Sequence, residues 1–348
     1  MKYKYKISVI IPTLNSEKYL DLSLKSIFNQ KNIDKLDVII VDAFSKDKTR
    51  QIAKKFPVRI IDNNLVTGEA GKMLGLKKSK HGIVSFIDSD NIMYDRNYFF
   101  QAINIFNNHS NLNIDCIEPI GYKFLKNDSI INKYCALMGL NDPIEFYLER
   151  FDRKNIIYKD YTAFPKINII NNSKYRIDKL PKHTHPFPTF GANGTIYKKN
   201  ILKKYLNFSK TKYLFDTDLT FKIYKKNNKF IICKIKSHII HYYCDDIKKF
   251  IKKQSRRISD YLFHKYKSRI GRRENIKIPV IKLINIFLKF IFIIPVFIDS
   301  ILIYKKTNYK IGLFTHFNLT YITILTYLLH ILKFIVNKNF KILDRKKF

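Results

Sequence analysis

The stretch Ser8–Gln30, SVIIPTLNSEKYLDLSLKSIFNQ, decides the fold, because a short apolar run leads directly into an amphipathic segment. An apolar run without regular polar alternation is typical of a strand buried on both faces. The same pattern repeats and predicts strands at Ile7–Ile11, Val38–Val41, Val58–Ile61 and Ile83–Ile87, with helices at Ser16–Gln30, Lys46–Phe56 and Glu69–Ser79. Such strands, separated by helices, indicate an α/β, Rossmann-like fold with a mostly parallel sheet flanked by helices.

Acidic residues follow two of these strands. Ligands of open α/β sheets bind just beyond the carboxyl ends of the strands. Asp88 and Asp90 stand two residues apart at such an end and can jointly hold a divalent cation and a ribose or phosphate oxygen. Surface turns also use Asp freely, but the apolar strand before this pair favours a binding site. Asp42, which follows an earlier strand, can accept hydrogen bonds from a base or ribose, or it can cap a helix.

The second half of the chain is less regular. Residues 115–181 give no clear pattern, and Gly191–Gly194 indicates a tight backbone. We expect a helix at Leu214–Lys225, strands at Lys229–Lys234 and His238–Tyr243, and a basic helix at Asp246–Phe263. His183 and His185 have metal-like spacing, but their predicted position in a loop and the lack of a nearby cysteine favour a structural or acceptor-side role.

Two apolar stretches, Ile278–Tyr304 and Leu313–Val336, are each long enough to cross a membrane. In each, the polar residues recur at helical spacing and form a stripe, as in helices that lie in a membrane interface. Basic residues flank both stretches, so a spanning hairpin would place lysines outside, against the positive-inside tendency. We therefore favour two interfacial or re-entrant helices on the cytoplasmic face of a membrane over a spanning pair, and both over a buried pair in a soluble domain.

The composition is strongly basic, with 65 Lys and Arg against 28 Asp and Glu and a formal charge of +37. Such an excess suits a polyanionic partner such as anionic lipid, a phosphorylated substrate or nucleic acid, and codon bias is an alternative explanation. Nucleic-acid binding does not explain acids at several strand ends, so we expect an anionic membrane surface and no nucleic acid as partners. The four cysteines include no C-x-x-C pair and suggest free thiols in a reducing cytosol.

The chain resembles the family 2 glycosyltransferases of the GT-A fold. The resemblance rests on Ser8–Gln30, on VIIVDAFSKDKT at Val38–Thr49 and on the Asp88-Ser89-Asp90 turn. It continues through FGANGTIYKKNIL at Phe190–Leu202, LFDTDLTFKIYKKN at Leu214–Asn227 and IIHYY at Ile239–Tyr243. Each motif is loose alone, but their common order and spacing are specific.

The resemblance implies a role for each matching residue. Thr13 and Glu17 would line the base pocket of a nucleotide-sugar donor, and Asp42 would contact the base. Asp88 would hold the ribose and assist the metal, which Asp90 and His241 would bind. Lys72 would face the diphosphate, and Asp216 would be the catalytic base. His241 on an apolar strand is equally consistent with a core histidine, and Asp216 with a helix N-cap. Gly191 allows close backbone approach, and Asn193 is a candidate contact for the acceptor.

The sequence departs from the family pattern at several positions. Phe215 stands where the family has Glu, so Asp218 is an alternative base, and Met73 replaces a common Asn. Gln254–Ile258 is similar to the Q-x-x-R-W motif of processive members but lacks the Trp. A non-processive enzyme is therefore expected, in which Arg257 is a candidate phosphate ligand.

The sequence thus predicts an inverting glycosyltransferase of cell-envelope polysaccharide synthesis. It would use Mn²⁺ or Mg²⁺, a UDP- or GDP-linked donor and a lipid-linked or saccharide acceptor. The expected segments are a catalytic domain at residues 1–245, a basic linking helix at 246–275 and a membrane-associated helical pair at 276–348. A basic nucleic-acid-binding protein and a catalytically degenerate membrane scaffold are the alternatives.

Overall fold

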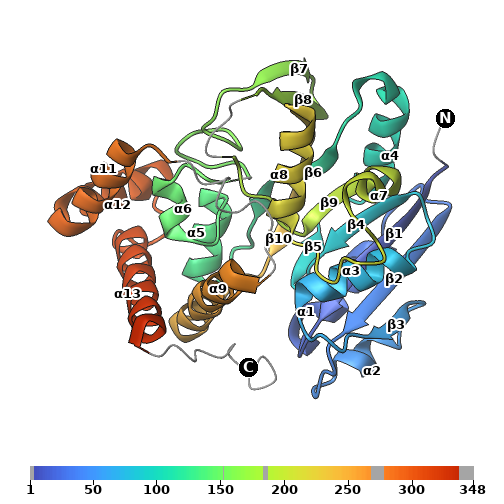
Figure 1. Ribbon diagram of the computed structural model, residues 1–348, viewed down its shortest axis with the longest axis horizontal. Coiled ribbons are helices and arrows are strands. Elements are labelled where there is room, and N and C mark those ends of the chain that lie inside the picture. Colours follow the sequence, from blue (N-terminus) through green and yellow to red (C-terminus); the bar gives the residue numbers. More distant parts are fainter. Residues whose placement is uncertain (1–3, 152, 183–186, 268–277, 337–348) are drawn as a thin grey trace. The chain divides into compact units, whose positions relative to one another are not determined.

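The computed structural model describes residues 4–151, 153–182, 187–267 and 278–336 (Figure 1). His183, His185 and the predicted boundary at residues 275 and 276 lie outside these ranges. The chain divides into two compact units. Unit 1 consists of residues 1–121, 165–184 and 190–241, and unit 2 of residues 122–164, 185–189 and 242–348. The units are therefore interleaved along the chain, where the sequence predicted consecutive segments.

Unit 1 is built on a ten-stranded mixed sheet with the order β3-β2-β1-β4-β9-β6-β10-β8-β7, in which β5 pairs with β10. Its strands are β1 (Lys6–Thr13), β2 (Lys35–Asp42), β3 (Arg59–Asp62), β4 (Ile83–Ile87), β5 (Asn91–Met93), β6 (Cys116–Lys123), β7 (Ile167–Asn171), β8 (Tyr175–Leu180), β9 (Asn193–Lys198) and β10 (Phe230–His241). Its helices are α1 (Glu17–Phe28), α2 (Thr49–Ala53), α3 (Gly68–Lys78), α4 (Tyr98–Asn108), α7 (Lys199–Tyr205) and α8 (Asp216–Asn227), with a 3₁₀ turn at Ser110–Leu112. The sheet flanked by helices confirms the predicted α/β fold class, but the sheet is mixed and not mostly parallel.

The first four strands of the chain form the parallel part of the sheet. β1 lies between β2 and β4, and β2 pairs with β3, all in parallel. The aliphatic side chains of β1, β2 and β4 are almost completely buried, as their uninterrupted apolar sequences predicted. Burying one such side chain stabilises the fold by about 1.5–3 kcal/mol. The register sets Thr13 opposite Asp42, so two predicted site residues end neighbouring strands.

Strands from the second half of the chain extend the sheet in antiparallel fashion. β9 pairs antiparallel with both β4 and β6. The two strands predicted between residues 229 and 243 are one continuous strand, β10. β10 also pairs with the short β5, and this register places His241 opposite Asn91. The pairing therefore brings the predicted metal-binding histidine beside the Asp88–Asp90 turn.

Helix α3 packs closely on β1 because of a glycine. A Cβ atom at Gly75 would lie 2.3 Å from Cγ2 of Ile10 and 3.1 Å from Cγ2 of Val41. Real Cβ atoms do not approach other atoms so closely, so glycine is the residue that fits here. The close contact fixes the distance between α3 and the strands whose ends form the predicted site.

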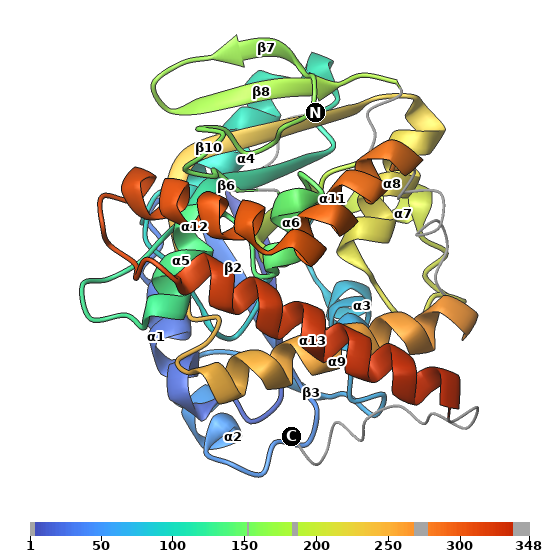
Figure 2. The same ribbon diagram turned by 90° about the vertical axis from the view of Figure 1, so that its left-hand side faces the viewer.

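Unit 2 is helical. Its helices are α5 (Ile130–Met138), α6 (Pro143–Tyr147), α9 (Ile247–Lys267), α11 (Val280–Phe292), α12 (Ile294–Lys306) and α13 (Thr315–Val336). α13 packs along α9, and Figure 2 shows the two helices side by side. The core joins distant segments, since Tyr134 and Phe151 lie in one cluster with Phe250, Ile303 and Leu319.

Part of each polar stripe of the C-terminal helices contacts the protein, while Asn285, Lys289 and Lys333 are exposed. Lys282 Nζ of α11 lies 2.5 Å from a Glu149 carboxylate oxygen, and Lys289 Nζ lies 3.4 Å from one of Asp299. In α13, His316 is buried, and its ring nitrogens lie 2.7 and 2.8 Å from the hydroxyls of Tyr134 and Tyr147. The sequence predicted stripes of the kind found in interfacial helices. Part of each stripe contacts the protein because unit 2 offers acids and hydroxyls as partners.

The apolar faces of the same helices are exposed. α11 exposes Val280, Ile281, Phe287, Ile291 and Phe292, and α13 exposes Leu325, Leu328, Leu329, Leu332 and Ile335. The first apolar stretch of the sequence is not one helix, because it bends by 89° between α11 and α12. Among the described helices, α13 has the length and hydropathy to cross a membrane, and the bent pair would qualify if it counted as one span.

Candidate active site

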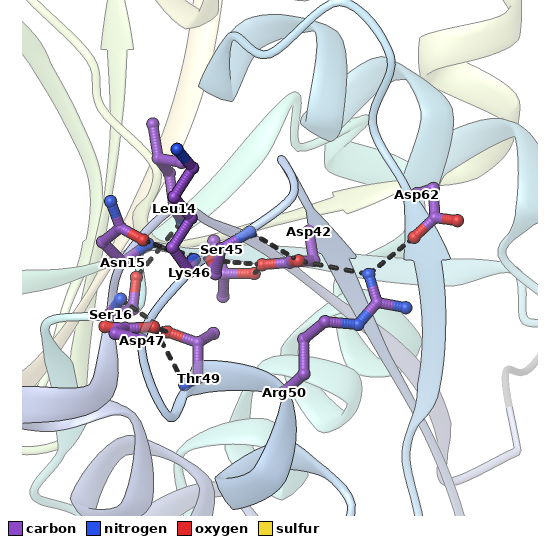
Figure 3. A network of polar contacts seen from close by, with 11 residues as sticks. Leu14, Asn15, Ser16, Asp42, Ser45, Lys46, Asp47, Thr49, Arg50 and Asp62 are labelled. Carbon is purple, nitrogen blue, oxygen red and sulfur yellow. Dashed lines mark hydrogen bonds and ion pairs between the residues drawn. The ribbon is translucent and has the colours of Figure 1, made fainter. Parts of the chain in front are cut away.

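Asp42 holds the ends of β1 and β2 together. Its buried carboxylate accepts hydrogen bonds from Thr13 Oγ1 at 2.9 Å and from the Ser45 hydroxyl at 2.5 Å, and it forms an ion pair with Arg50 at 3.3 Å (Figure 3). Arg50 also reaches Asp62, at the end of β3, at 2.6 Å. Thr13, predicted to line the base pocket, and Asp42, predicted to contact the base, thus hold the ends of β1 and β2 together, and Arg50 links them to the end of β3.

The loops after β1 and β2 are joined by reciprocal hydrogen bonds. Glu17 Oε2 accepts from the backbone N–H of Lys48, and Asp47 accepts from the backbone N–H of Glu17. Asn15 donates its N–H to Ser45 and accepts from the N–H of Lys46, as Figure 3 shows for this loop pair. Glu17 thus lies at the predicted edge of the sheet, where it closes the loop beside Asp42.

The end of β4 meets the end of β1 at the same edge. The Ser89 hydroxyl donates to the Ser16 hydroxyl at 2.8 Å, and the N–H of Asp88 donates to the carbonyl of Ala192 at 3.1 Å. Asp90 Oδ1 lies 3.5 Å from Nε2 of His241. The Asp88–Asp90 turn is therefore in contact with the β1 loop, with the glycine segment before β9 and with the end of β10.

Lys72 and Asp216 form a buried ion pair that the sequence did not predict. Both side chains are about one-tenth exposed, and Lys72 Nζ contacts Asp216 Oδ2. The other oxygen, Oδ1, is buried with no hydrogen-bond partner among the described residues. Asp216 is the first residue of α8, and Phe215 occupies the N-cap. Lys72 thus faces the predicted base, where the resemblance implied a contact with the donor diphosphate.

Negative charge collects around this pair. Burial raises the pKa of Asp88 to about 7; Lys72 opposes the shift, while Asp90, Asp216 and Glu69 add to it. Burial also raises the pKa of Asp216, against the lowering effect of Lys72. Burial would lower the pKa of Lys72, but Asp216, Glu69 and Asp88 together raise it to about 12. The site therefore favours the binding of additional positive charge.

Glu69 is a member of this cluster that the sequence analysis missed. It lies in the first turn of α3, and its backbone carbonyl accepts a hydrogen bond from the N–H of Leu214 at 2.9 Å. An acid in the first turn of a helix is usually explained by the helix dipole, so nothing in the pattern singled it out. Asp218, the alternative base, lies one residue beyond Thr217 on α8 and is partly buried.

The predicted acceptor segment precedes β9. A Cβ atom at Gly191 would lie 3.1 Å from Nδ2 of Asn193, so the glycine makes room for the buried asparagine amide. Thr195 Oγ1 lies 2.6 Å from the Gly191 carbonyl oxygen and 2.7 Å from Glu118 Oε1. Gly194 has a φ of +81°, a conformation that glycine adopts without strain. These contacts fix the backbone next to Asp88.

Arg257, the candidate phosphate ligand, lies in unit 2. Its guanidinium contacts Asp142 Oδ2 at 3.3 Å and the carbonyl of Asn141 at 3.3 Å. Asp142 also accepts a hydrogen bond from the Tyr327 hydroxyl at 2.5 Å. In this structure Arg257 therefore connects α9 to the start of α6, and Asp142 neutralises its charge.

The residues at the end of β4 fit a divalent cation in part. Among the described residues, no group of three or more His, Cys, Asp or Glu side chains surrounds one point. The carboxylates of Asp88 and Asp90, with His241 beside them, supply hard oxygen ligands and an imidazole. Such a set suits a cation that takes its remaining ligands from water and from a diphosphate.

The sheet and site together define the class of the protein. A mixed sheet with joined loops at the carboxyl edge of its parallel part, an Asp-x-Asp turn beside a histidine, and a buried Asp at a helix start are the features of a nucleotide-sugar glycosyltransferase of the GT-A fold. The model of the family "Glycosyl transferase family 2" matches residues 8–206, more than half of the chain. The chain belongs to that family.

Characterised relatives match shorter segments. The chain is 36% identical over 99 residues to the poly(ribitol-phosphate) beta-N-acetylglucosaminyltransferase TarP of Staphylococcus aureus, which covers 26% of this chain and 30% of TarP. It is 29% identical over 116 residues to the minor teichoic acid biosynthesis protein GgaB of Bacillus subtilis, a match that covers 31% of this chain and 13% of GgaB. It is 26% identical over 136 residues to the Escherichia coli beta-1,3-glucosyltransferase WfgD, a match that covers 38% of this chain and 51% of WfgD. The matches span about half of each relative or less.

Solved structures are similar at low sequence identity. S. aureus TarS 1-349 is 16% identical, with a TM-score of 0.44 over 98% of this chain and 95% of that one. The mannosyltransferase PcManGT of Pyrobaculum calidifontis, solved with GDP-Man and Mn²⁺, is 15% identical, with a TM-score of 0.44 over 76% and 63%.

Proposed function

We propose that this glycosyltransferase is inverting, metal-dependent and non-processive. We also propose that it acts at the cytoplasmic face of a membrane. Its donor would be a UDP- or GDP-linked sugar and its acceptor a lipid-linked or saccharide molecule. The observation that carries the proposal is the cluster of Asp88, Asp90 and His241 at the end of β4, with Asp216 and Lys72 beside it.

The proposed reaction assigns one task to each residue. Asp216 accepts the proton of the acceptor hydroxyl while that oxygen attacks the anomeric carbon from the face opposite the leaving group. Asp88, Asp90 and His241 would hold a divalent cation, which would supply positive charge to offset that of the departing nucleoside diphosphate. Thr13, Glu17 and Asp42 order the loops that would enclose the base. Gly191 and Asn193 would meet the acceptor.

The relatives support an acceptor that carries phosphate. TarP is named for a poly(ribitol-phosphate) acceptor, and WfgD for a GlcNAc-diphosphoundecaprenol acceptor and a UDP-Glc donor. The formal charge of +37 on this chain suits an acceptor of that kind, because basic surfaces attract polyanions. UDP-linked sugars are therefore the first donors to test.

Unit 2 supports membrane association. Its C-terminal helices expose apolar faces while Lys282 and Lys289 bind acids of the same unit. Exposed apolar helix faces of this kind are typical of a protein that contacts lipid. The exposed lysines at Lys305, Lys306 and Lys310 are placed to meet anionic headgroups. This arrangement favours attachment to one leaflet.

The experiment is a turnover assay with purified full-length protein in detergent. UDP-GlcNAc, UDP-glucose and GDP-mannose are each incubated with Mn²⁺, with Mg²⁺ or with EDTA, and the released nucleoside diphosphate is measured. We expect turnover of one donor, lost in EDTA and lowered at least about 100-fold by Asp90→Ala. Asp95→Ala, five residues further along the chain, is the control and should keep its turnover. Equal turnover of Asp90→Ala and the unmodified protein would remove this turn from the mechanism.

A further inference from the structure

The contact between Lys72 and Asp216 conflicts with the role of a base. A carboxylate paired with an ammonium group is a weaker proton acceptor than a free one. The proposed reaction also needs positive charge near the leaving diphosphate, and Lys72 is coupled electrostatically to Asp88 as well as to Asp216. Lys72 must therefore release Asp216 before the proton moves, and its ammonium needs another partner at that moment.

Glu69 is placed to be that partner. It precedes Lys72 by three residues on α3, a spacing at which side chains of one helix are neighbours. The hydrogen bond from the Leu214 N–H to the Glu69 carbonyl ties this turn of α3 to the segment that leads into α8. One Glu69 carboxylate oxygen is buried from solvent. Asp216 contacts the Lys72 ammonium from α8, and Glu69 lies near it on the same helix as Lys72.

The electrostatics agree with this placement. Among the groups that raise the pKa of Lys72, Glu69 follows Asp216 and precedes Asp88. Glu69 also raises the pKa of Asp216 and that of Asp88. These effects show that the Glu69 carboxylate lies near all three groups.

We propose that Glu69 is a positioning residue that acts through Lys72. It offers the ammonium a second carboxylate, so that Lys72 leaves Asp216 when a donor diphosphate binds and Asp216 Oδ2 becomes free to accept a proton. This inference rests on the proposed function, in which Asp216 is the base. A simpler role for Glu69, stabilising the N-terminus of α3 through the helix dipole, predicts an effect on stability but none on the base.

The test compares Glu69→Gln, Lys72→Met, the double variant and Glu69→Asp in the turnover assay with Mn²⁺ and the active donor. The charged groups near Asp216 are Lys72 and Glu69 from α3 and Asp88 from the end of β4. Asp216 acts without its proton, so turnover rises as the pH passes its pKa. Removing the negative charge of Glu69 lowers that pKa and moves the acidic limb of the profile to lower pH. Removing the positive charge of Lys72 moves it to higher pH.

We expect Glu69→Gln to lower kcat on the pH plateau about tenfold, with the donor KM changed by less than about twofold. Glu69→Asp, which keeps the charge, should recover most of this loss. In the Lys72→Met background, Glu69→Gln should cause no further loss on the plateau, because the residue through which it acts is gone. Asp21→Asn, on the surface of α1, is the control for removal of an acidic charge.

The outcomes separate the two proposals. If the unmodified enzyme is active, three results would contradict the role of Glu69. Glu69→Gln could keep its plateau kcat, or it could cause the same loss with and without Lys72. Glu69→Asp could also be as impaired as Glu69→Gln. A protein that turns over no donor overturns the proposed function and this inference together. Thermal unfolding of each variant shows whether a loss of turnover arises from loss of the fold.

Discussion

Lys234 and Glu118 form an ion pair whose two side chains are completely buried in the sheet, 2.6 Å apart. Replacing Lys234 by Met would leave the Glu118 carboxylate buried without its counter-charge, so we expect a loss of about 3–5 kcal/mol in the free energy of unfolding. Urea denaturation would measure it. Lys236→Met is the matched control, since Lys236 lies two residues further along β10 and is exposed. An equal effect of the two substitutions would contradict the importance of the pair.

The roles of single residues were predictable only where the backbone decides them. Asp42 and Asp88 follow parallel strands, whose carboxyl ends meet at one edge, so their convergence followed from the sequence. The contact of Lys72 with Asp216 did not follow from the sequence, because the two residues are 144 positions apart and the direction of a side chain depends on packing. Glu69 was missed for the same reason, since an acid in the first turn of a helix has a simpler explanation.

At the scale of elements, the fit of α3 against β1 depends on Gly75. An added Cβ would lie 2.3 Å from Ile10 Cγ2, so Gly75→Ala must push the helix away. We expect a destabilisation of about 1–3 kcal/mol, with lower turnover because Lys72 and Glu69 move with the helix. Thermal unfolding and the turnover assay would measure the two effects.

Gly68→Ala is the matched control on the same helix. A Cβ at Gly68 would have no atom of the described residues within 4 Å. Alanine also favours the helix, so this variant should be neutral or slightly more stable. A Gly75→Ala variant as stable as Gly68→Ala would show that α3 tolerates the shift.

Helix α11 gives a prediction about membranes. Phe287 is 63% exposed on its apolar face. Phe287→Asp places a charge where lipid contact is proposed, so we expect binding to vesicles of phosphatidylglycerol and phosphatidylcholine to fall about tenfold or more in flotation assays. Leu22→Asp, at a 46% exposed position on α1, makes the same kind of change in unit 1 and should not alter binding. Equal loss in both variants would point to non-specific attraction.

Element types were largely predictable, and some boundaries were not. The apolar strands and the helix at Asp216 were predicted with small errors at their ends. β10 was predicted as two strands because Lys234 and Lys236 interrupt its apolar pattern, yet Lys234 is buried by its pairing with Glu118. The polar stripes of α11 and α13 were found, but which way they face depends on acids such as Glu149, far away in sequence.

At the scale of the whole molecule, the C-terminal helices belong to the core of unit 2. Ile303, Ile311 and Leu319 share one buried cluster with Tyr134 and Phe151. We therefore expect a chain that ends at residue 279 to lose the packing of unit 2, and not simply to detach from membranes. Limited proteolysis and near-ultraviolet circular dichroism would show the loss. A truncated protein with a native dichroism spectrum would contradict this, and full-length Phe287→Asp is the folded reference.

This arrangement was beyond the sequence. Residues 115–181 gave no clear pattern, and the structure assigns 122–164 to unit 2 and 165–184 to unit 1. The change in composition near Ile278 suggested a separate segment there. Composition counts apolar residues but does not show which other residues they pack against. Which helices share a core depends on contacts between residues such as Tyr134 and Leu319, and no local pattern encodes them.

The interleaving of the two units has a consequence for synthesis. Residues 122–164 leave the ribosome long before Leu319, with which Tyr134 and Phe151 pack. At about 5–20 residues per second, the wait is on the order of ten to thirty seconds. During that time their apolar side chains are exposed unless another protein, such as a chaperone, binds them. Slower growth at low temperature, with chaperones in excess, is therefore the rational starting condition for producing this protein.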